Sequence, residues 1–282
     1  MIDSKWKQTI SHSIQEGSRR RAGRFVIGRF PGFGATAWFF FAFLYLPILI
    51  LVVFSFNTGR SATIWHGFSL EWYGKAFAND DIQRAAVNSL TVAVTATAFA
   101  TVFATFAALV MVRMNRFRGQ NVSYAVLMLP LIVPEIVTAV ATLSFFTAVG
   151  LNLGLGRVII AHTVFCTPFA FLPIRARLEG MDATLEQAAQ DLYADEWQAF
   201  RHVTLPLLMP GVISGAMLSF IISMDDFIIT LMIAQAGSTT LPLYIYGMVR
   251  MGITPEINAV STVVLAISIT FVSLSYLIGR WK

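Results

Sequence analysis

The sequence is poor in charge and in cysteine, and each shortage excludes a class of protein. Only 12% of the 282 residues are charged, whereas 56% are hydrophobic. Soluble domains carry about 25% charged residues, so this composition predicts an integral membrane protein. The single cysteine, Cys166, excludes an internal disulfide and a thiolate metal cage. Its apolar neighbours predict a small buried side chain.

The chain also lacks the residues that nucleotide and metal sites require. It contains no Gly-x-x-x-x-Gly-Lys-Ser/Thr loop, which excludes that mode of ATP binding. His162 has no second histidine or cysteine nearby in the sequence, so we expect a hydrogen-bonded packing residue rather than a metal ligand. We therefore expect this chain to bind no cofactor and to be no enzyme.

Long apolar runs fill most of the remaining sequence. A helix needs about 20 apolar residues to cross the hydrocarbon core of a bilayer. Prolines interrupt the third and fourth of the runs that qualify. We therefore predict an all-α membrane protein with a six-helix domain over 35–282, preceded by a basic arm over 1–34 on the bilayer surface or disordered. The six predicted spans are 35–56, 86–112, 122–149, 156–177, 207–235 and 256–279.

The distribution of positive charge predicts the orientation of these spans. Loops on the cytoplasmic side of a membrane carry an excess of lysine and arginine. With the N-terminus inside, the outer segments hold only a quarter of the twenty basic residues, namely Arg60, Lys75, Arg84, Arg157 and Arg250. We therefore expect both termini in the cytoplasm and see no need for nucleic acid to explain the net charge of +5.

The outer loop 57–84 is rich in aromatic residues. It contains Trp65, Trp72 and Tyr73. Amphipathic rings settle at membrane interfaces, so anchoring is favoured over contact with a partner protein. A short surface helix is expected at about 70–78.

A polar stretch over 178–211 separates the fourth and fifth predicted spans and is expected in the cytoplasm. Thr184 with Gln187, and Asp195 with Gln198, have the spacing of helix-capping boxes. Pro206 and Pro210 suit the start of the next helix. We therefore predict two short helices at an angle. The first would place four residues on one apolar face, namely Leu185, Ala188, Ala189 and Leu192.

Two readings of this polar stretch compete, a helix lying on lipid and a docking site for protein. A helix on anionic lipid needs lysine or arginine on its polar face. This one carries acidic residues, of which Glu186 and Asp191 are expected to remain available to a basic partner. Ala188 and Ala189 are small enough to let another surface approach closely. Protein docking is therefore favoured.

The polar stretch resembles the cytoplasmic coupling loop of ABC importer permeases. The family pattern is Glu-Ala-Ala, three residues, Gly, nine residues and Ile-x-Leu-Pro, and this chain matches it at 188–189 and 205–206. Gln187 departs from it where the family prefers glutamate. Tyr193 departs where the family has glycine, and a left-handed conformation costs a non-glycine residue about 1 kcal/mol or more.

Other stretches resemble the permease subunits of spermidine/putrescine importers. They lie along nearly the whole chain and include Ser-Phe-Asn (55–57), Trp-Tyr (72–73), Arg-Phe-Arg-Gly (116–119), His-Thr-Val-Phe-Cys (162–166), Ser-Met-Asp-Asp (223–226), Thr-Thr-Leu-Pro (239–242) and Pro-Glu-Ile-Asn-Ala (255–259). Any one of these matches is weak, and their combination is specific.

The resemblance implies a type I ABC importer permease in a bacterial inner membrane. It implies a second homologous permease subunit, two ATPase subunits that use ATP and magnesium, and a periplasmic solute-binding protein. Closure of the ATPases would push on the coupling loop and switch the cavity between its two openings. The residues that the resemblance assigns to this coupling are Thr184, Glu186, Gln187, Ala188, Ala189, Asp191, Leu192, Tyr193 and Pro206.

Three acidic residues lie inside predicted spans, where a carboxylate is costly unless it faces a cavity or a partner. They are Glu135, Asp225 and Asp226. One reading is a path for a cation such as a polyamine, with Phe227, Tyr244 and Tyr246 as cation–π faces. The other reading is structural, since one of the adjacent aspartates is expected to cap a broken helix or bind backbone.

Rival functions remain open at this stage. A different amine, an opine or a quaternary ammonium compound would suit the same carboxylates. A secondary transporter commonly has inverted repeats, and none is found between the two halves. An intramembrane hydrolase would need Ser214 near His162, but the predicted topology puts these residues toward opposite membrane faces. The small residues over 211–216 are instead expected to let helices pack.

Overall fold

The computed structural model describes residues 33–59, 64–114, 117–182, 184–252 and 255–280. The chain divides into two units, Met1–Val53 and Phe54–Lys282, and each is considered by itself. The first unit holds most of α2 (Phe33–Phe54), and the predicted arm over 1–34 lies almost wholly outside the described residues. The boundary predicted between 34 and 35 therefore stays a prediction.

Nearly all of the described chain is helical, which confirms the predicted all-α class. The second unit begins with α3 (Glu71–Ala78), α4 (Asp80–Arg113), α5 (Gln120–Ile132), α6 (Glu135–Val149) and α7 (Leu155–Glu179). It continues with α8 (Thr184–Asp191), α9 (Glu196–Ala199), a π-helical turn (Phe200–Thr204), α10 (Leu205–Asp225), α11 (Ile228–Ile233), α12 (Leu241–Met251) and α13 (Pro255–Arg280).

Four helical stretches of the described chain are long and apolar enough to cross a membrane, and the first three match the first, second and fourth predicted spans. The fourth stretch, Glu196–Asp225, overlaps the fifth predicted span, 207–235, but begins before it and ends at a break within it. The third predicted span is the pair α5 and α6, bent by 112° between them, which would make a fifth crossing. The sixth predicted span is α13, in which Pro255–Thr270 is an apolar helix of shorter length. A membrane protein is thus confirmed, while the count of six crossings stays a prediction.

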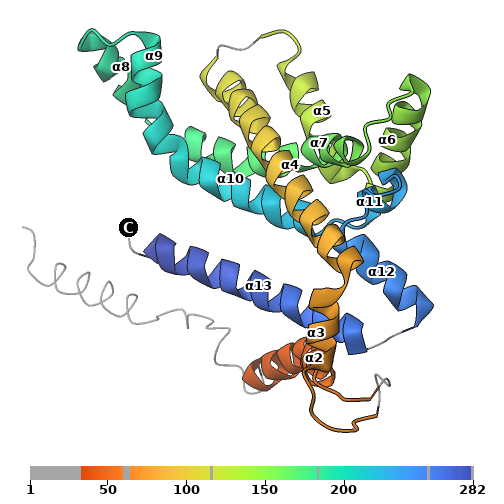
Figure 1. The fold of residues 1–282 in the computed structure, drawn as a ribbon. Coiled ribbons are helices and arrows are strands. Elements are labelled where there is room, and N and C mark those ends of the chain that lie inside the picture. The colour runs from red at the N-terminus through yellow and green to blue at the C-terminus, as the bar shows by residue number, and fades with distance from the viewer. Residues whose placement is uncertain (1–32, 60–63, 115–116, 183, 253–254, 281–282) are drawn as a thin grey trace, which may run out of the picture. The chain divides into compact units, whose positions relative to one another are not determined.

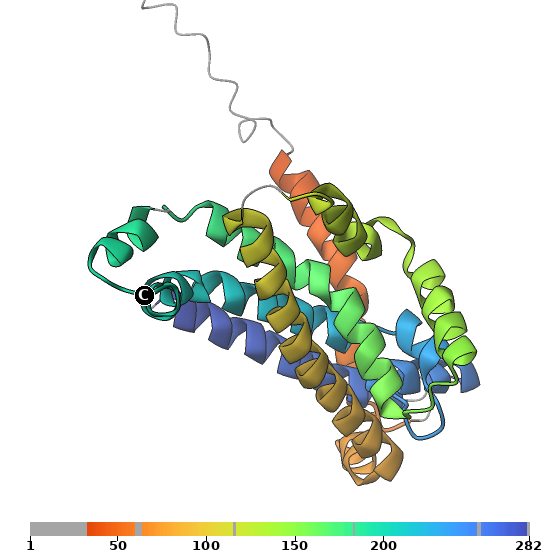
Figure 2. The same ribbon diagram turned by 90° about the horizontal axis from the view of Figure 1, so that it is seen from above.

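The core of the second unit lies where α4, α7 and α10 pack together (Figures 1 and 2). The buried face of α4 consists largely of alanines spaced three or four residues apart, all of them wholly buried. Small residues let membrane helices approach closely, and dispersion contacts and hydrogen bonds then hold them. These alanines are Ala93, Ala96, Ala100, Ala104 and Ala108.

Two glycines of α10 serve the same purpose against α7. A Cβ atom at Gly215 would lie 2.6 Å from the Ala170 carbonyl oxygen. A Cβ atom at Gly211 would lie 2.6 Å from the Arg177 Cβ. Both distances are shorter than any ordinary contact, so the helices meet at their backbones. The expectation that small residues over 211–216 allow packing is confirmed.

Proline explains the sharp bend between α5 and α6. Pro134 has no amide hydrogen, and its ring disfavours the helical conformation at the residue before it. Accordingly α5 ends at Ile132, Val133 is extended with ψ of 135°, and α6 begins directly after Pro134. The bend places Glu135 in the first turn of a new helix rather than midway along a continuous one.

The loop before α4 forms the short helix expected at 70–78, here Glu71–Ala78. Interface anchoring was expected for its aromatic residues, but two of the three make hydrogen bonds within the chain instead. Trp72 is buried and its Nε1 donates a hydrogen bond to the Asn57 carbonyl oxygen at 2.9 Å. The Tyr73 hydroxyl lies 2.6 Å from the Ser55 hydroxyl. Trp65 alone of the three stays largely exposed, at 47%.

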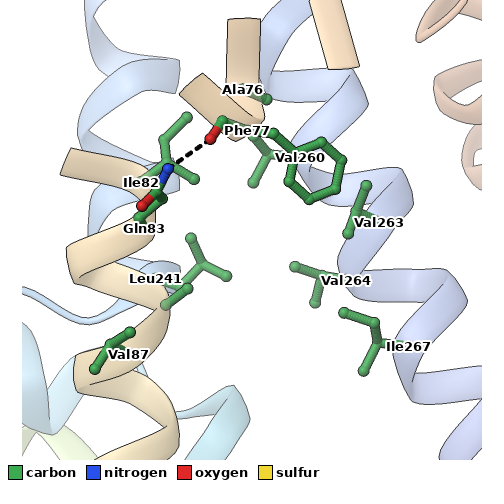
Figure 3. Close-up of a pocket in the computed structure, with 11 residues that line it drawn as sticks. Ala76, Phe77, Ile82, Gln83, Val87, Leu241, Val260, Val263, Val264 and Ile267 are labelled. Atoms are coloured by element: carbon green, nitrogen blue, oxygen red, sulfur yellow. Dashed lines mark hydrogen bonds between the residues drawn. The ribbon is translucent and has the colours of Figure 1, made fainter. Parts of the chain in front are cut away.

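An apolar cavity of about 380 Å³ lies where α3, α4, α12 and α13 meet (Figure 3). Valines and Ile267 of α13 face Ile82 and Val87 of α4 across it. Gln83, the polar residue of the lining, donates its side-chain amide to the Phe77 carbonyl oxygen at 2.6 Å. The cavity therefore presents hydrocarbon, with no chemistry of its own.

The close contact at Gly215 gives a direct test of this packing. Gly215→Ala should destabilise the chain by about 1–3 kcal/mol, because the added methyl group overlaps a backbone atom that cannot move aside. The matched control is Gly247→Ala in α12, where nothing lies within 4 Å of the new Cβ. The measurement is the thermal unfolding midpoint in detergent. Equal midpoints for the two variants would contradict the packing described.

Candidate functional site

The polar stretch between α7 and α10 begins with helix α8, and its first turn is capped by an aspartate. Asp182 Oδ1 accepts the backbone amide of Thr184 at 2.9 Å. Hydrogen bonds from Thr184 hold the pKa of the Asp182 carboxyl group below its ordinary value. The capping role predicted for Thr184 is therefore wrong, since Thr184 is already the first helical residue and Asp182, two positions earlier, accepts its amide.

Helix α8 ends in a left-handed residue, and that residue is Tyr193, with φ of +66°. In the described part of the chain no other non-glycine residue has positive φ. The Tyr193 amide donates to the Gln190 carbonyl oxygen at 2.9 Å, and the Ala194 amide donates to that of Ala189 at 3.0 Å. These two bonds form a Schellman motif, which normally uses glycine at the left-handed position. The turn therefore forms even though tyrosine stands at position 193, where the family pattern has glycine.

The second helix of the polar stretch starts as predicted and continues further than predicted. Asp195 and Gln198 form the expected capping box. From Glu196 the helix runs through a π turn into α10 and ends only at Asp225. The prediction of a separate second short helix is therefore wrong. The wider π turn, closed by the Leu205 amide on the Phe200 carbonyl oxygen, lets the chain accept Pro206 without breaking.

An exposed apolar patch covers α8 and the residues that follow it. Ala188 lies exposed on the same helix, and α8 buries none of its described residues. Large exposed apolar side chains gathered on one short segment are typical of an interaction site. The large side chains of the patch are Leu185, Leu192, Tyr193 and Trp197, the last two 97% and 64% exposed.

Glu186 does not lie free for a basic partner, as had been expected. Its Oε1 lies 3.2 Å from Arg113 Nε at the end of α4 and accepts the Thr204 hydroxyl at 2.9 Å. The expectation failed because Arg113 is 73 positions away in the sequence, so spacing gave no sign of the pair. Asp191 does remain exposed.

A second group of predicted residues gathers around a cavity of about 330 Å³ among the spanning helices. Glu135 reaches it from α6, Asp225 and Asp226 from the end of α10, and Phe227 from the break before α11. The remaining walls are apolar, supplied by Phe165, Ile221, Ile222 and Ile228. The three carboxylates predicted inside spans therefore share one site.

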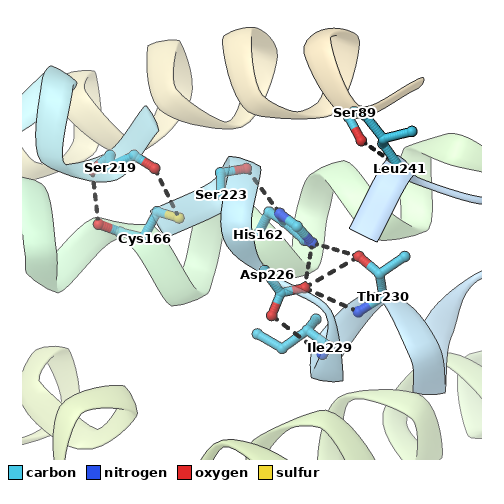
Figure 4. Close-up of polar contacts among 9 residues, drawn as sticks. All are labelled: Ser89, His162, Cys166, Ser219, Ser223, Asp226, Ile229, Thr230 and Leu241. Carbon is cyan, nitrogen blue, oxygen red and sulfur yellow. Dashed lines mark hydrogen bonds and ion pairs between the residues drawn. The ribbon is translucent and has the colours of Figure 1, made fainter. Parts of the chain in front are cut away.

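Asp226 has a structural role within this site (Figure 4). Its Oδ1 accepts the Ile229 amide at 3.3 Å, and its Oδ2 accepts the Thr230 amide and hydroxyl, both at 3.1 Å. His162 Nε2 lies 3.0 Å from the same Oδ2, and His162 Nδ1 lies 2.8 Å from the Ser223 hydroxyl. The alternative that one aspartate caps a broken helix is confirmed, as is the reading of His162 as a hydrogen-bonded packing residue.

Asp225 and the three predicted aromatic residues lie in different surroundings. Asp225 is exposed, and its side chain makes no hydrogen bond or ion pair within the described ranges. The Phe227 ring lies 4.5 Å from that of Tyr246, which in turn faces Arg250 at 4.7 Å. Tyr244 instead packs against the apolar cluster around Leu241 and Val260, so the structure does not bring it to the carboxylates.

Known proteins resemble this chain in sequence and in fold. Residues 100–281 match the family model described as "Binding-protein-dependent transport system inner membrane component". The spermidine/putrescine transport system permease protein PotC of Haemophilus influenzae is 40% identical over 85% of this chain and 93% of its own. The putrescine transport system permease protein PotI of Escherichia coli (strain K12) is 39% identical over 85% of this chain and 88% of its own.

A solved structure shows the same fold at low sequence identity. It is a chain of a bacterial alginate ABC transporter, crystallised in complex with an alginate pentasaccharide-bound periplasmic protein. The TM-score is 0.66 at 17% identity, over 86% of this chain and 89% of the other. The predicted permease fold is thereby confirmed.

The strained turn at Tyr193 can be tested directly. Tyr193→Gly should stabilise the end of α8 by about 1 kcal/mol, because glycine adopts positive φ without a steric penalty. Hydrogen exchange of the Ala194 amide, which donates to Ala189, should slow by roughly fivefold. The control, Ala194→Gly, removes a side chain beside the same turn without relieving the strain. Faster exchange in Tyr193→Gly than in the unaltered chain would contradict the assignment.

Proposed function

The chain belongs to the family of binding-protein-dependent transport system inner membrane components, and we propose that it carries polyamines as the permease subunit of an ATP-driven importer. The relatives that are 39% and 40% identical to it are named for putrescine and for spermidine/putrescine transport. The observation on which the proposal rests in this chain is the meeting of Glu135, Asp225 and Asp226 around one cavity.

The chemistry of that cavity suits a flexible polyammonium chain. Asp226 is engaged by backbone amides, Thr230 and His162. Glu135 shares a side-chain hydrogen bond with Asp226, so Asp225 is the carboxylate of the three that is best placed to receive an ammonium group. Apolar walls match the methylene segments between those groups. Phe227 lines the cavity beside the carboxylates and adds an aromatic face, where a cation gains about 0.5–2 kcal/mol. The Tyr246 ring packs against that of Phe227.

The coupling loop is proposed as the docking site for ATPase subunits. Its support is the exposed apolar patch around Ala188, which has no covering element among the described residues. A second permease subunit, two ATPases that use ATP and magnesium, and a periplasmic binding protein complete the proposed complex. Both termini and the coupling loop face the cytoplasm in this scheme, as the distribution of basic residues favours.

Removing one carboxylate should separate the two roles assigned to the aspartates. Asp225→Asn should lower polyamine uptake by the reconstituted complex about tenfold at subsaturating solute, because one charge-assisted contact is worth about 1.5–3 kcal/mol. The fold should be unaffected, since Asp225 is exposed and caps no helix.

The matched control is Asp80→Asn, an exposed acidic residue in the first turn of α4 and outside the cavity. It removes the same charge and should leave uptake unchanged. Uptake measured with radiolabelled putrescine and spermidine distinguishes the variants. Wild-type uptake by Asp225→Asn would exclude Asp225 from the solute path.

The docking proposal is tested at the exposed helix. Ala188→Trp should abolish copurification of the ATPase subunits, because an indole there keeps the opposing surface several ångströms away. Gln190→Trp is the control, since Gln190 is equally exposed but lies on the opposite side of α8 from the apolar stripe. Retention of the ATPases by Ala188→Trp would show that this face does not dock them.

A further inference from the structure

An ion pair and a hydrogen bond join three elements at the coupling loop. Glu186 of α8 contacts Arg113, the last residue of α4, and also the Thr204 hydroxyl at the end of the π turn that leads into α10. All three groups are shielded from solvent, with the Arg113 and Glu186 side chains 21% and 25% exposed and Thr204 buried. An ion pair so shielded is screened less by water and salt than a surface pair.

The surroundings of Arg113 leave Glu186 as the partner of its guanidinium group. Its Nε and Nη2 atoms are buried and, within the described part of the chain, form no hydrogen bond of good geometry. The Glu186 carboxylate at 3.2 Å is therefore the group that balances this charge. Breaking one side of such a pair leaves the other charge desolvated and uncompensated.

The elements joined by Glu186 are those that would have to move together. Helix α4 packs along α7 and α10 in the core and contacts α12. Helix α8 carries the exposed patch and makes few contacts with the rest of the second unit beyond α9 and the π turn. The contact of Glu186 with Arg113 therefore joins α8 directly to α4, whereas the other connection runs through the π turn and α10.

We propose that the Arg113–Glu186–Thr204 contact is the link through which movement of the coupling helix is passed to α4 and α10. Glu186 is a positioning residue in this scheme. Its carboxylate faces the permease body, while the apolar face of α8 meets the ATPase. This inference rests on the proposed docking function and adds to it that the two faces of α8 have different roles.

The test compares uptake with ATP hydrolysis in the same proteoliposomes. Arg113→Gln and Glu186→Gln should each lower the solute carried per ATP hydrolysed by roughly fivefold or more, the lower end of typical coupling between sites. The ATPases should still copurify, since the apolar face of α8 is intact. The charge exchange Arg113→Glu with Glu186→Arg should restore most of the lost ratio.

The matched control is Arg118→Gln, an exposed arginine on the connection between α4 and α5 that lies in no ion pair of the described residues. It should leave the ratio unchanged. An unchanged ratio in both Arg113→Gln and Glu186→Gln overturns the proposal. Loss of the ATPases from Glu186→Gln also overturns it, because Glu186 would then belong to the docking surface.

A variant without charge change covers the case in which the charge variants do not accumulate. Thr204→Val keeps the side-chain volume and removes only the hydroxyl that binds Glu186. It should lower the ratio to an intermediate value, and a wild-type ratio overturns the proposal.

A second measurement is independent of the solute. Cys166 is wholly buried, so a cysteine placed at Ile221 in the cavity would be the accessible thiol to follow with maleimide. ATP should change its labelling rate in the unaltered chain and not in Glu186→Gln, whereas an equal ATP effect in both overturns the link. Failure of the unaltered complex to carry polyamine would count against the proposed function alone.

Discussion

A helix that breaks inside a membrane segment leaves backbone amides without acceptors, and lipid offers none. The structure meets this constraint at the end of α10 with the Asp226 carboxylate. Its two oxygens take the amides of Ile229 and Thr230, which α11 leaves free at its start. His162 Nε2 lies 3.0 Å from the same carboxylate and gives it a further polar partner inside the helix bundle. The Asp226 side chain holds the start of α11, and with it the wall of the acidic cavity, while Ile229 and Ile233 pack the same helix into the core.

The same constraint explains why two adjacent aspartates have different roles. Asp226 turns inward at the break, where its side chain is 1% exposed. Its carboxylate oxygens are occupied by the hydrogen bonds that hold the start of α11. Asp225 is the last residue of α10 and stays exposed to the cavity. A bent pair of helices places Glu135 opposite, again at a helix start created by a break. Breaks in two spans therefore bring carboxylates to one site that continuous helices would hold apart.

Composition and local spacing predicted most of the architecture, because apolar length, capping boxes and prolines act over a few residues. The extent of α2, α4 and α7, the capping box at Asp195 and the small residues at 211–216 all follow from such local rules. The contacts that give each acidic residue its role join residues that lie far apart in the sequence. The pair of His162 with Asp226 and the pair of Arg113 with Glu186 leave no trace in spacing. The sequence could therefore predict that one aspartate is structural, but not which one.

The continuity of one helix joins the two sites. The chain from Glu196 to Asp225 is a single helical rod of 30 residues, about 45 Å long at 1.5 Å per residue. Its first turns belong to the coupling loop and its last residue lies at the acidic cavity. Two separate short helices would have placed a flexible joint between those ends. Because the π turn absorbs Pro206 instead of breaking the rod, a displacement at Trp197 must be carried along α10 to Asp225 or taken up at the π turn itself.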